Sequence, residues 1–416
     1  MKVNTFPLLL WGILMAGPVG GFPSMAISSE IGQLPVPDQP RAEELSNLGS
    51  GLLKDTTSGT SLSGVLESPT GNWIEFDGQD VAASNSGGNW DDNLRFAIDL
   101  SSRYVVLTHG KKDFSQQFIG IDLHKVLVGP DGDWGTFIFQ GYLTRINNQE
   151  RHPAAFESDN DWEMVYRIWN LNYTALADGE MNFKLGRFEI PYGLEHDIDT
   201  NGHLLDYLSL RNLGLKPDWG ATINGILPHW QYEIGLSRGT GIEYTQRNDP
   251  YIVSGRISTP AEGILVMGLS GFHGRVANAG AVANVRAGLA DPAELGAVGS
   301  IVRRTRFGLD AAWYTASQFA LLGEVSVGRD YRQDVVNGLV ELDWNSQDET
   351  VLLYLQGRFF NQRFTSGWDD AFATRLGVRY NPDNHWDFSA QYIQNISAFR
   401  AAPHDAAVAF QIRYRY

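Results

Sequence analysis

The charged side chains with the clearest capacity for chemistry gather in one segment, residues 192–216. Its acidic members are Glu195, Asp197, Asp199 and Asp206, and its histidines are His196 and His203. Carboxylates beside a narrow aqueous passage attract cations, because low-dielectric walls focus their field. On the outer surface of a protein, the same residues would form an ordinary solvated loop. The chain offers no paired second set of metal ligands, so we expect no bound metal.

Seven arginines form a second candidate set in the C-terminal part of the chain. If alternate residues of each strand share a face, all seven side chains lie on the polar face of the strands, which would line an interior passage. Facing an acidic loop, they would create a transverse field that orients dipolar solutes. Alternatively, they pair with Asp310, Glu324, Glu341, Asp343 and Asp387 and make a polar interior rigid. The seven are Arg304, Arg306, Arg358, Arg375, Arg379, Arg413 and Arg415.

Motifs for zinc-dependent hydrolysis and for phosphate binding are lacking. The chain has no His-Glu-x-x-His metal motif and no Gly-rich phosphate loop. Because it has no cysteine, it forms no disulfide, no thiolate metal site and no covalent haem link. We therefore expect a protein that is not an enzyme and that holds no cofactor.

Apolar and polar side chains alternate at a period of two from near Asn93 to the C-terminus. The stretch Ala406–Tyr416 shows this clearly and ends on an aromatic residue. Such runs suit strands tilted across a bilayer, which need about 9 to 11 residues. We predict about sixteen strands, or about eighteen if the first run is two strands and a run near Trp73 adds another. The runs are 94–106, 116–127, 134–145, 161–174, 181–191, 217–227, 230–239, 250–258, 263–273, 303–313, 318–329, 332–344, 349–361, 370–380, 385–395 and 406–416.

The connections between these runs alternate in length after the first loop, with a brief exception at Asp330 and Tyr331. Outer-membrane barrels have this asymmetry, with short periplasmic turns, long extracellular loops, an apolar outer face and a polar lumen. We therefore predict an all-β fold, a transmembrane antiparallel up-and-down β-barrel. Short turns fall at 129–133, 177–179, 228–229, 259–262, 315–317, 345–348 and 381–384, and longer loops at 146–160, 192–216, 240–249, 274–302, 362–369 and 396–404.

The N-terminus predicts export. Lys2 precedes an apolar run from Phe6 to Val19, and Ser24 and Ala26 suit signal-peptidase cleavage. We therefore divide the chain into a signal peptide, residues 1–26, an irregular segment, residues 27–92, and the barrel, residues 93–416. The irregular segment is a periplasmic extension, a plug or a disordered stretch. No later stretch of about 18 apolar residues predicts a transmembrane helix.

Net charge narrows the range of partners. The formal charge is −16, so we expect no nucleic acid partner. The same charge argues against a protein that attracts anions through its net charge.

Two stretches carry a family resemblance. Gly186–Glu195 reads GRFEIPYGLE, and Arg211–Gly241 reads RNLGLKPDWGATINGILPHWQYEIGLSRGTG. Both resemble the phosphate-selective porin O and P family, with Tyr192 where the family usually has Phe. The resemblance covers most of the chain after Asn93 and implies a monomeric or trimeric water-filled barrel narrowed by an inward-folded loop, here 192–216. Phosphate selectivity does not follow, because the family binds phosphate with a ladder of Lys and Arg, whereas this acidic chain has seven lysines.

The expected function is that of an outer-membrane porin, located in the outer membrane of a bacterial cell. Small hydrophilic solutes or ions would diffuse passively through it, with outer-membrane lipid around it and a homotrimer as one assembly. The alternative is a barrel that sheathes a periplasmic partner, such as a multihaem cytochrome in an electron conduit. Residues 27–92 and the acidic charge motivate this alternative.

Overall fold

The computed structural model describes the chain from Asn93 onward in thirteen ranges. The signal peptide and the irregular segment predicted for residues 1–92, including the run near Trp73, lie outside the described residues. The described ranges are 93–107, 114–130, 132–147, 161–196, 198, 204–205, 207–241, 250–261, 263–277, 301–315, 318–364, 367–397 and 406–416.

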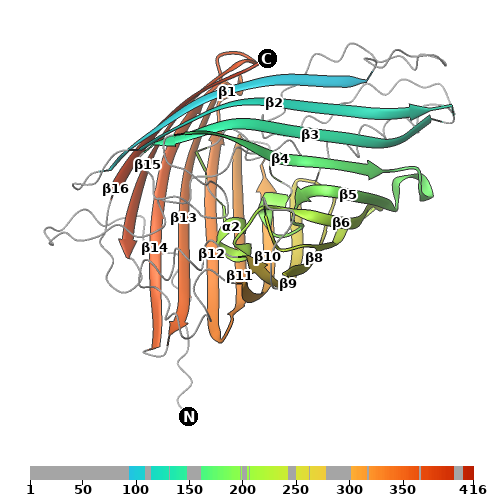
Figure 1. The fold of residues 1–416 in the computed structure, drawn as a ribbon. Helices are drawn as coiled ribbons and strands as arrows, with labels where there is room; N and C mark the ends of the chain where they lie inside the picture. The colour runs from blue at the N-terminus through green and yellow to red at the C-terminus, as the bar shows by residue number, and fades with distance from the viewer. Residues whose placement is uncertain are drawn as a thin grey trace, which may run out of the picture.

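Sixteen antiparallel strands close into one barrel, in which each strand pairs with its neighbours in sequence (Figure 1). The first eight are β1 (Leu94–Leu107), β2 (Phe114–Gly129), β3 (Gly132–Asn147), β4 (Trp162–Tyr173), β5 (Asn182–Glu189), β6 (Pro217–Ile226), β7 (Gln231–Ser237) and β8 (Tyr251–Ser258). The others are β9 (Leu265–Ala277), β10 (Ile301–Tyr314), β11 (Phe319–Asp330), β12 (Gln333–Asn345), β13 (Val351–Phe364), β14 (Gly367–Tyr380), β15 (Trp386–Ser397) and β16 (Ala406–Arg415).

The closure between β1 and β16 removes the free edges of the sheet. Nine residue pairs, from Asp99↔Arg415 to Leu107↔Ala407, align the two strands. The backbone of Tyr416 exchanges two further hydrogen bonds with Ile98. This confirms the predicted barrel of about sixteen strands, and the first run is one strand. Among the described residues, no helix is long and apolar enough to cross a membrane.

The alternation of side chains places apolar residues outside and polar residues inside. On β13, Leu355 is 48% exposed, whereas its neighbour Gln356 is 0% exposed. The strand β10 alternates in the same way along its whole length, from Ile301 to Tyr314. Because the sheet is closed, its buried face is the barrel interior. This matches the predicted apolar outer face and polar lumen.

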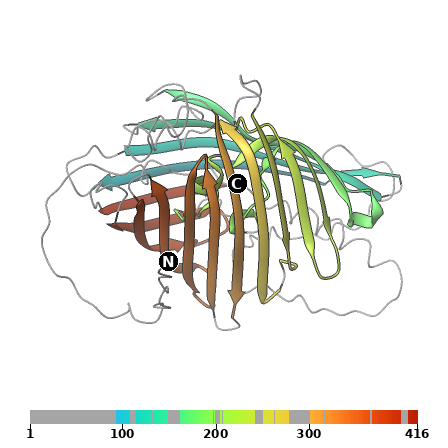
Figure 2. The ribbon, with the colours of Figure 1, turned by 90° about the horizontal axis from the view of Figure 1, so that it is seen from below.

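The strands of the two walls run in different directions. In Figure 1, β1 to β3 lie at a steep angle to β12 to β14, and the view from below in Figure 2 shows the same crossing. Tilted strands produce this arrangement, because opposite walls of a barrel incline in opposite senses. The interior therefore lies between two crossed layers of inward-facing side chains.

One predicted loop is wrong. Residues 362–369 were expected to form a long connection, but β13 continues to Phe364 and β14 begins at Gly367, and these two residues pair. The register also pairs Arg363 with Trp368. Arg363 is exposed and points outward. Charged side chains at the rim of a membrane strand reach interfacial water, so they do not end the strand.

Candidate functional site

The connection between β5 and β6, residues 190–216, contains the predicted acidic loop. We call it the crossing segment; the structure describes residues 190–196, 198, 204–205 and 207–216 of it. It includes two short helices, η2 (Leu194–His196) and α2 (Ser209–Leu213). Its apolar side chains are buried, and they explain where it lies.

Three apolar clusters join the crossing segment to different parts of the wall. Ile190, Leu213 and Leu215 pack with Ile252 of β8 and with β9. The second cluster joins Leu205, Tyr207 and Leu208 to inward-facing side chains of β9 to β14, such as Leu322, Leu339 and Phe360. The third joins Leu204 to Val105 of β1, Ile393 of β15 and Ala407 of β16. Because β8 and β16 lie on opposite sides of the barrel order, the segment crosses the interior.

Glu324 of β11 anchors the first turn of the crossing segment. Its carboxylate accepts hydrogen bonds from Leu194 N and from Asn212 Nδ2, both at 3.0 Å. Gly193 N donates to Ser270 Oγ at 3.0 Å. Gly193 has a φ of 70°, and a Cβ there would lie 2.6 Å from Glu324 Oε2, so the close approach requires glycine.

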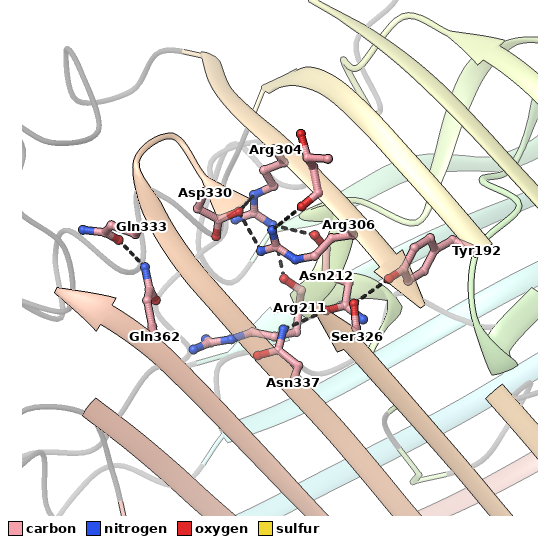
Figure 3. A network of polar contacts seen from close by, with 11 residues as sticks. Tyr192, Arg211, Asn212, Arg304, Arg306, Ser326, Asp330, Gln333, Asn337 and Gln362 are labelled. Carbon is pink, nitrogen blue, oxygen red and sulfur yellow. Dashed lines mark hydrogen bonds and ion pairs between the residues drawn. The ribbon is translucent and has the colours of Figure 1, made fainter. Parts of the chain in front are cut away.

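Polar contacts around α2 continue this attachment (Figure 3). Asn337 Nδ2 donates to Asn212 Oδ1 at 2.7 Å. Arg304 Nη1 donates to the carbonyl oxygens of Arg211 and Asn212 at 3.2 and 3.3 Å. The Tyr192 hydroxyl forms a hydrogen bond with Ser326 Oγ. The segment is therefore fixed by specific hydrogen bonds as well as by apolar packing.

Tyr207 carries a further anchor. Its hydroxyl donates to Glu341 Oε1 at 2.7 Å, and Gln356 Nε2 donates to Glu341 Oε2 at 2.6 Å. Burial raises the pKa of Tyr207 well above its ordinary value, and the nearby Glu341 carboxylate adds to this effect. The phenol therefore stays protonated and available as a donor.

The predicted acidic residues fall into two groups. Glu195 is 7% exposed; its carboxylate pairs with Lys216 Nζ and accepts a hydrogen bond from Ser209 N at 3.0 Å. It therefore ties the two ends of the crossing segment together. Asp197, Asp199 and Asp206 lie outside the described residues.

The seven predicted arginines lie on β10, β13, β14 and β16, and most are buried. Arg304 and Arg306 both pair with Asp330, at 3.4 and 2.6 Å (Figure 3). The guanidinium carbon of Arg358 lies 5.0 Å from the centre of the Phe360 ring. Arg375 of β14 lies near the carboxylate of Glu341. The remaining pairs are Arg379 with Asp387, Arg413 with Asp99, and Arg415 with Asp122.

Sequence reasoning missed several of these carboxylate partners. Asp99, Asp122 and Asp330 pair with arginines but were not predicted to do so. Asp310 was a predicted partner of the seven arginines, yet it binds Arg256 of β8 at 2.6 Å. An inward position in the two-residue alternation was the signal that could have found Asp99 and Asp122. Which carboxylate meets which arginine depends on strand register.

A polar recess, open to solvent, lies beside the crossing segment on the inner face of β4 to β8. Lys184 Nζ binds Glu233 there at 2.9 Å, and His196 Nε2 lies 3.7 Å from the same carboxylate. Further lining residues include Asn224 and Gln231. The recess therefore offers paired charges and amides, which suit contact with water and hydrophilic solutes.

Two specific arrangements can be compared with the described residues, a hydrolase nucleophile turn and a metal site. Gly235–Gly239 has Gly-x-Ser-x-Gly spacing, but Ser237 ends β7, and the strand β8 follows where a hydrolase nucleophile turn would need a helix. Within the described ranges, no three His, Asp or Glu side chains gather as a metal site.

The geometry defines a closed antiparallel barrel with an apolar exterior, a polar interior and an internal segment. No protein-family model and no curated protein matches the chain. Solved structures do match. OprB of Pseudomonas putida is 10% identical with a TM-score of 0.57, over 78% of this chain and 95% of that one. An anion-selective porin from Comamonas acidovorans is 10% identical with a TM-score of 0.51, over 78% and 99%.

A third match is OmpT, an outer membrane protein of Vibrio cholerae, in a trimer form. It is 14% identical with a TM-score of 0.52, over 78% of this chain and 99% of that one. At such low identities the likeness shows the fold alone. The chain therefore has the general fold of outer-membrane porins.

Proposed function

We propose that this protein is a passive channel of a bacterial outer membrane, through which small hydrophilic solutes or ions diffuse. The observation that carries the proposal is the crossing segment inside a barrel whose outer face is apolar and whose inner face is polar. An apolar exterior suits lipid, and a polar interior suits water. Such a channel needs no cofactor and no chemical step.

The crossing segment narrows the passage in this proposal. Leu204 reaches the β1, β15 and β16 wall, while Leu213 stays near β8 and β9. Solutes would therefore pass beside the segment, and the polar recess with Lys184, Glu233 and His196 would form part of their route. We also propose that the chain is similar to the phosphate-selective porin O and P family, but not that it shares the phosphate selectivity of that family.

Charge at the narrowing would set ion preference. Glu195 is paired with Lys216, and Arg413 and Arg306 are paired with strand carboxylates. These groups hold the interior in shape, and their fields largely cancel at a distance. We therefore assign cation preference to Asp197, Asp199 and Asp206, the remaining carboxylates of the segment.

The alternative, a sheath around a periplasmic partner, has weaker support. A partner inside the barrel would need the space between the walls where Leu204 and Leu208 pack. A homotrimer in outer-membrane lipid remains our proposed assembly, because OmpT of Vibrio cholerae has a trimer form.

A planar bilayer under a salt gradient tests the proposal. Purified protein should produce stable conductance steps, with a reversal potential that reports preference for cations. Replacing Asp197 and Asp199 by Asn should move that potential toward zero, while Asp334→Asn on the outer face should leave it unchanged. If both variants keep the wild-type potential, the charge assignment is wrong; if the wild type never conducts, the channel itself is refuted.

A further inference from the structure

On β9, β10, β11 and β13, four arginines point outward at one rim of the barrel, the rim that carries the long connections 238–250 and 278–300. They are Arg275 of β9, Arg303 of β10, Arg329 of β11 and Arg363 of β13. Each lies within a few residues of the strand end at this rim, and each is at least partly exposed. We call them the rim arginines.

Two of the rim arginines face each other. The register of β9 and β10 pairs Arg303 directly with Arg275. Like charges directly opposite across two strands destabilise a sheet. Within the part of the chain that the structure describes, no carboxylate forms an ion pair with either side chain. The arrangement becomes favourable once an anion lies between the two guanidinium groups.

The other two rim arginines share one carboxylate. Arg329 Nε lies 2.6 Å from Asp334 Oδ1, and Arg363 Nη1 lies 3.5 Å from Asp334 Oδ2. Two of the four rim arginines thus pair with the same carboxylate, Asp334. The formal charge of the chain is −16, so a basic outward row does not follow from average composition.

The side chains below the row follow the depth profile of a membrane surface. One step toward the middle of the barrel, His273 Nδ1 and Thr305 Oγ1 form a hydrogen bond at 2.8 Å, beside the ring of Tyr251. Beyond them the exposed residues are apolar, such as Leu269 and Phe307 at 53% and 61% exposure. The order of basic, polar and aromatic, then apolar groups matches headgroup, interface and acyl chain.

We propose that the rim arginines bind the phosphate groups of an anionic lipid in the leaflet on the long-loop side, with Arg275 and Arg303 bridged by one phosphate. A guanidinium group donates two parallel hydrogen bonds to phosphate oxygens, so two opposed arginines can hold one phosphate from both sides. The inference rests on the proposed function only in that the barrel sits in a bilayer. It does not require that the barrel conducts.

Native mass spectrometry in neutral detergent tests the proposal, with a bis-phosphorylated glucosamine-disaccharide lipid and its phosphate-free form as probes. Wild-type protein should retain the phosphorylated lipid in preference. The variant Arg275→Gln/Arg303→Gln should lose about tenfold in affinity, as expected for removing charge-assisted bidentate contacts. The control Arg95→Gln, at the opposite rim, should bind as the wild type does. Equal retention of both lipids, or wild-type affinity in the double variant, would overturn the proposal.

Thermal unfolding in lipid-free detergent keeps the test decisive. There the double variant should unfold at the wild-type temperature or above it, because a like-charge pair has been removed. A marked drop would mean that the arginines serve contacts within the protein, and would also overturn the proposal. Bilayer conductance should be unchanged in the variant. Loss of phosphate preference in a conducting wild type therefore refutes this inference alone, and a silent wild type that still prefers the phosphorylated lipid refutes the channel alone.

Discussion

Arg413 on β16 donates to both carboxylate oxygens of Asp99 on β1, although 314 positions separate them in the sequence; Arg413 Nε lies 2.8 Å from Asp99 Oδ1. The side chains are 5% and 0% exposed. This bidentate pair spans the seam at which the barrel closes. Charge-assisted pairs of this geometry are strong and directional, so the pair helps to specify register at the seam.

Asp99→Asn tests the seam. The change should destabilise the barrel by about 3 to 5 kcal/mol, because it leaves a buried guanidinium without its counter-charge. Asp334→Asn is the control, since its pairs with Arg329 and Arg363 are exposed and worth about 0 to 1 kcal/mol. The free energy of unfolding in urea gives both values. Equal small losses would show that the Asp99 pair does not secure the seam.

Tyr207→Phe tests the anchor of the crossing segment. The loss of the hydroxyl leaves Glu341 Oε1 without its donor, at an expected cost of about 1 to 3 kcal/mol. Channel current should become noisier as the segment loosens. Tyr232→Phe serves as the control, because its hydroxyl donates to Glu180 O at an exposed site. If the two variants behave alike, Tyr207 does not fix the segment.

Leu355→Arg tests which face meets lipid. Leu355 lies in the middle of the outward apolar row of β13, which runs from Val351 to Phe359. Arginine near the bilayer midplane should cost about 2 to 4 kcal/mol. The control Asn361→Arg, nearer the rim, should cost about 0 to 1 kcal/mol. Unfolding from lipid vesicles measures both, and an unaffected Leu355→Arg barrel would mean that this face does not contact lipid.

The turn between β14 and β15 should contribute less to stability as the pH falls. Asp383 Oδ1 accepts hydrogen bonds from His385 N and Trp386 N at 2.8 and 2.9 Å, and these bonds lower the pKa of Asp383. A lowered folded-state pKa means that the stabilisation is complete above the unfolded value of about 3.9 and is lost as pH falls through the folded value. Asp383→Ala should therefore unfold at a lower temperature than wild type at pH 7, with the gap closing below about pH 4. A gap that is the same at both pH values would contradict this.

Local pattern was sufficient to predict the strands. Each of the sixteen alternating runs became a strand. The polarity of each residue alone indicates its face, as with the buried polar Gln356 and the exposed apolar Leu355. The wrong loop at 362–369 has a physical cause. Arg363 and Trp368 pair across β13 and β14 at the rim, where water accepts a charge, so a polar residue there did not mark a turn.

The candidate site was less predictable, because it depends on contacts between distant parts of the chain. The segment 192–216 was chosen for its carboxylates, but Leu204, Leu205 and Leu208 fix the crossing segment to the wall. Their run LLDYLSL was a visible signal of burial within an acidic loop. The ion-pair partners of the arginines could not be predicted from the sequence, because the register between β10 and β11 brings Asp330 to Arg306.

The most direct test of the central claim uses the absence of cysteine in the chain. Gln231 lines the recess beside the crossing segment, whereas Ile234 points outward and is 58% exposed. Single-channel current is measured for Gln231→Cys and Ile234→Cys before and after a water-soluble, bulky thiol reagent. A channel narrowed by the crossing segment predicts a lasting fall in current for Gln231→Cys and none for Ile234→Cys. Absence of current before the reagent, or equal effects on both variants, would contradict the claim.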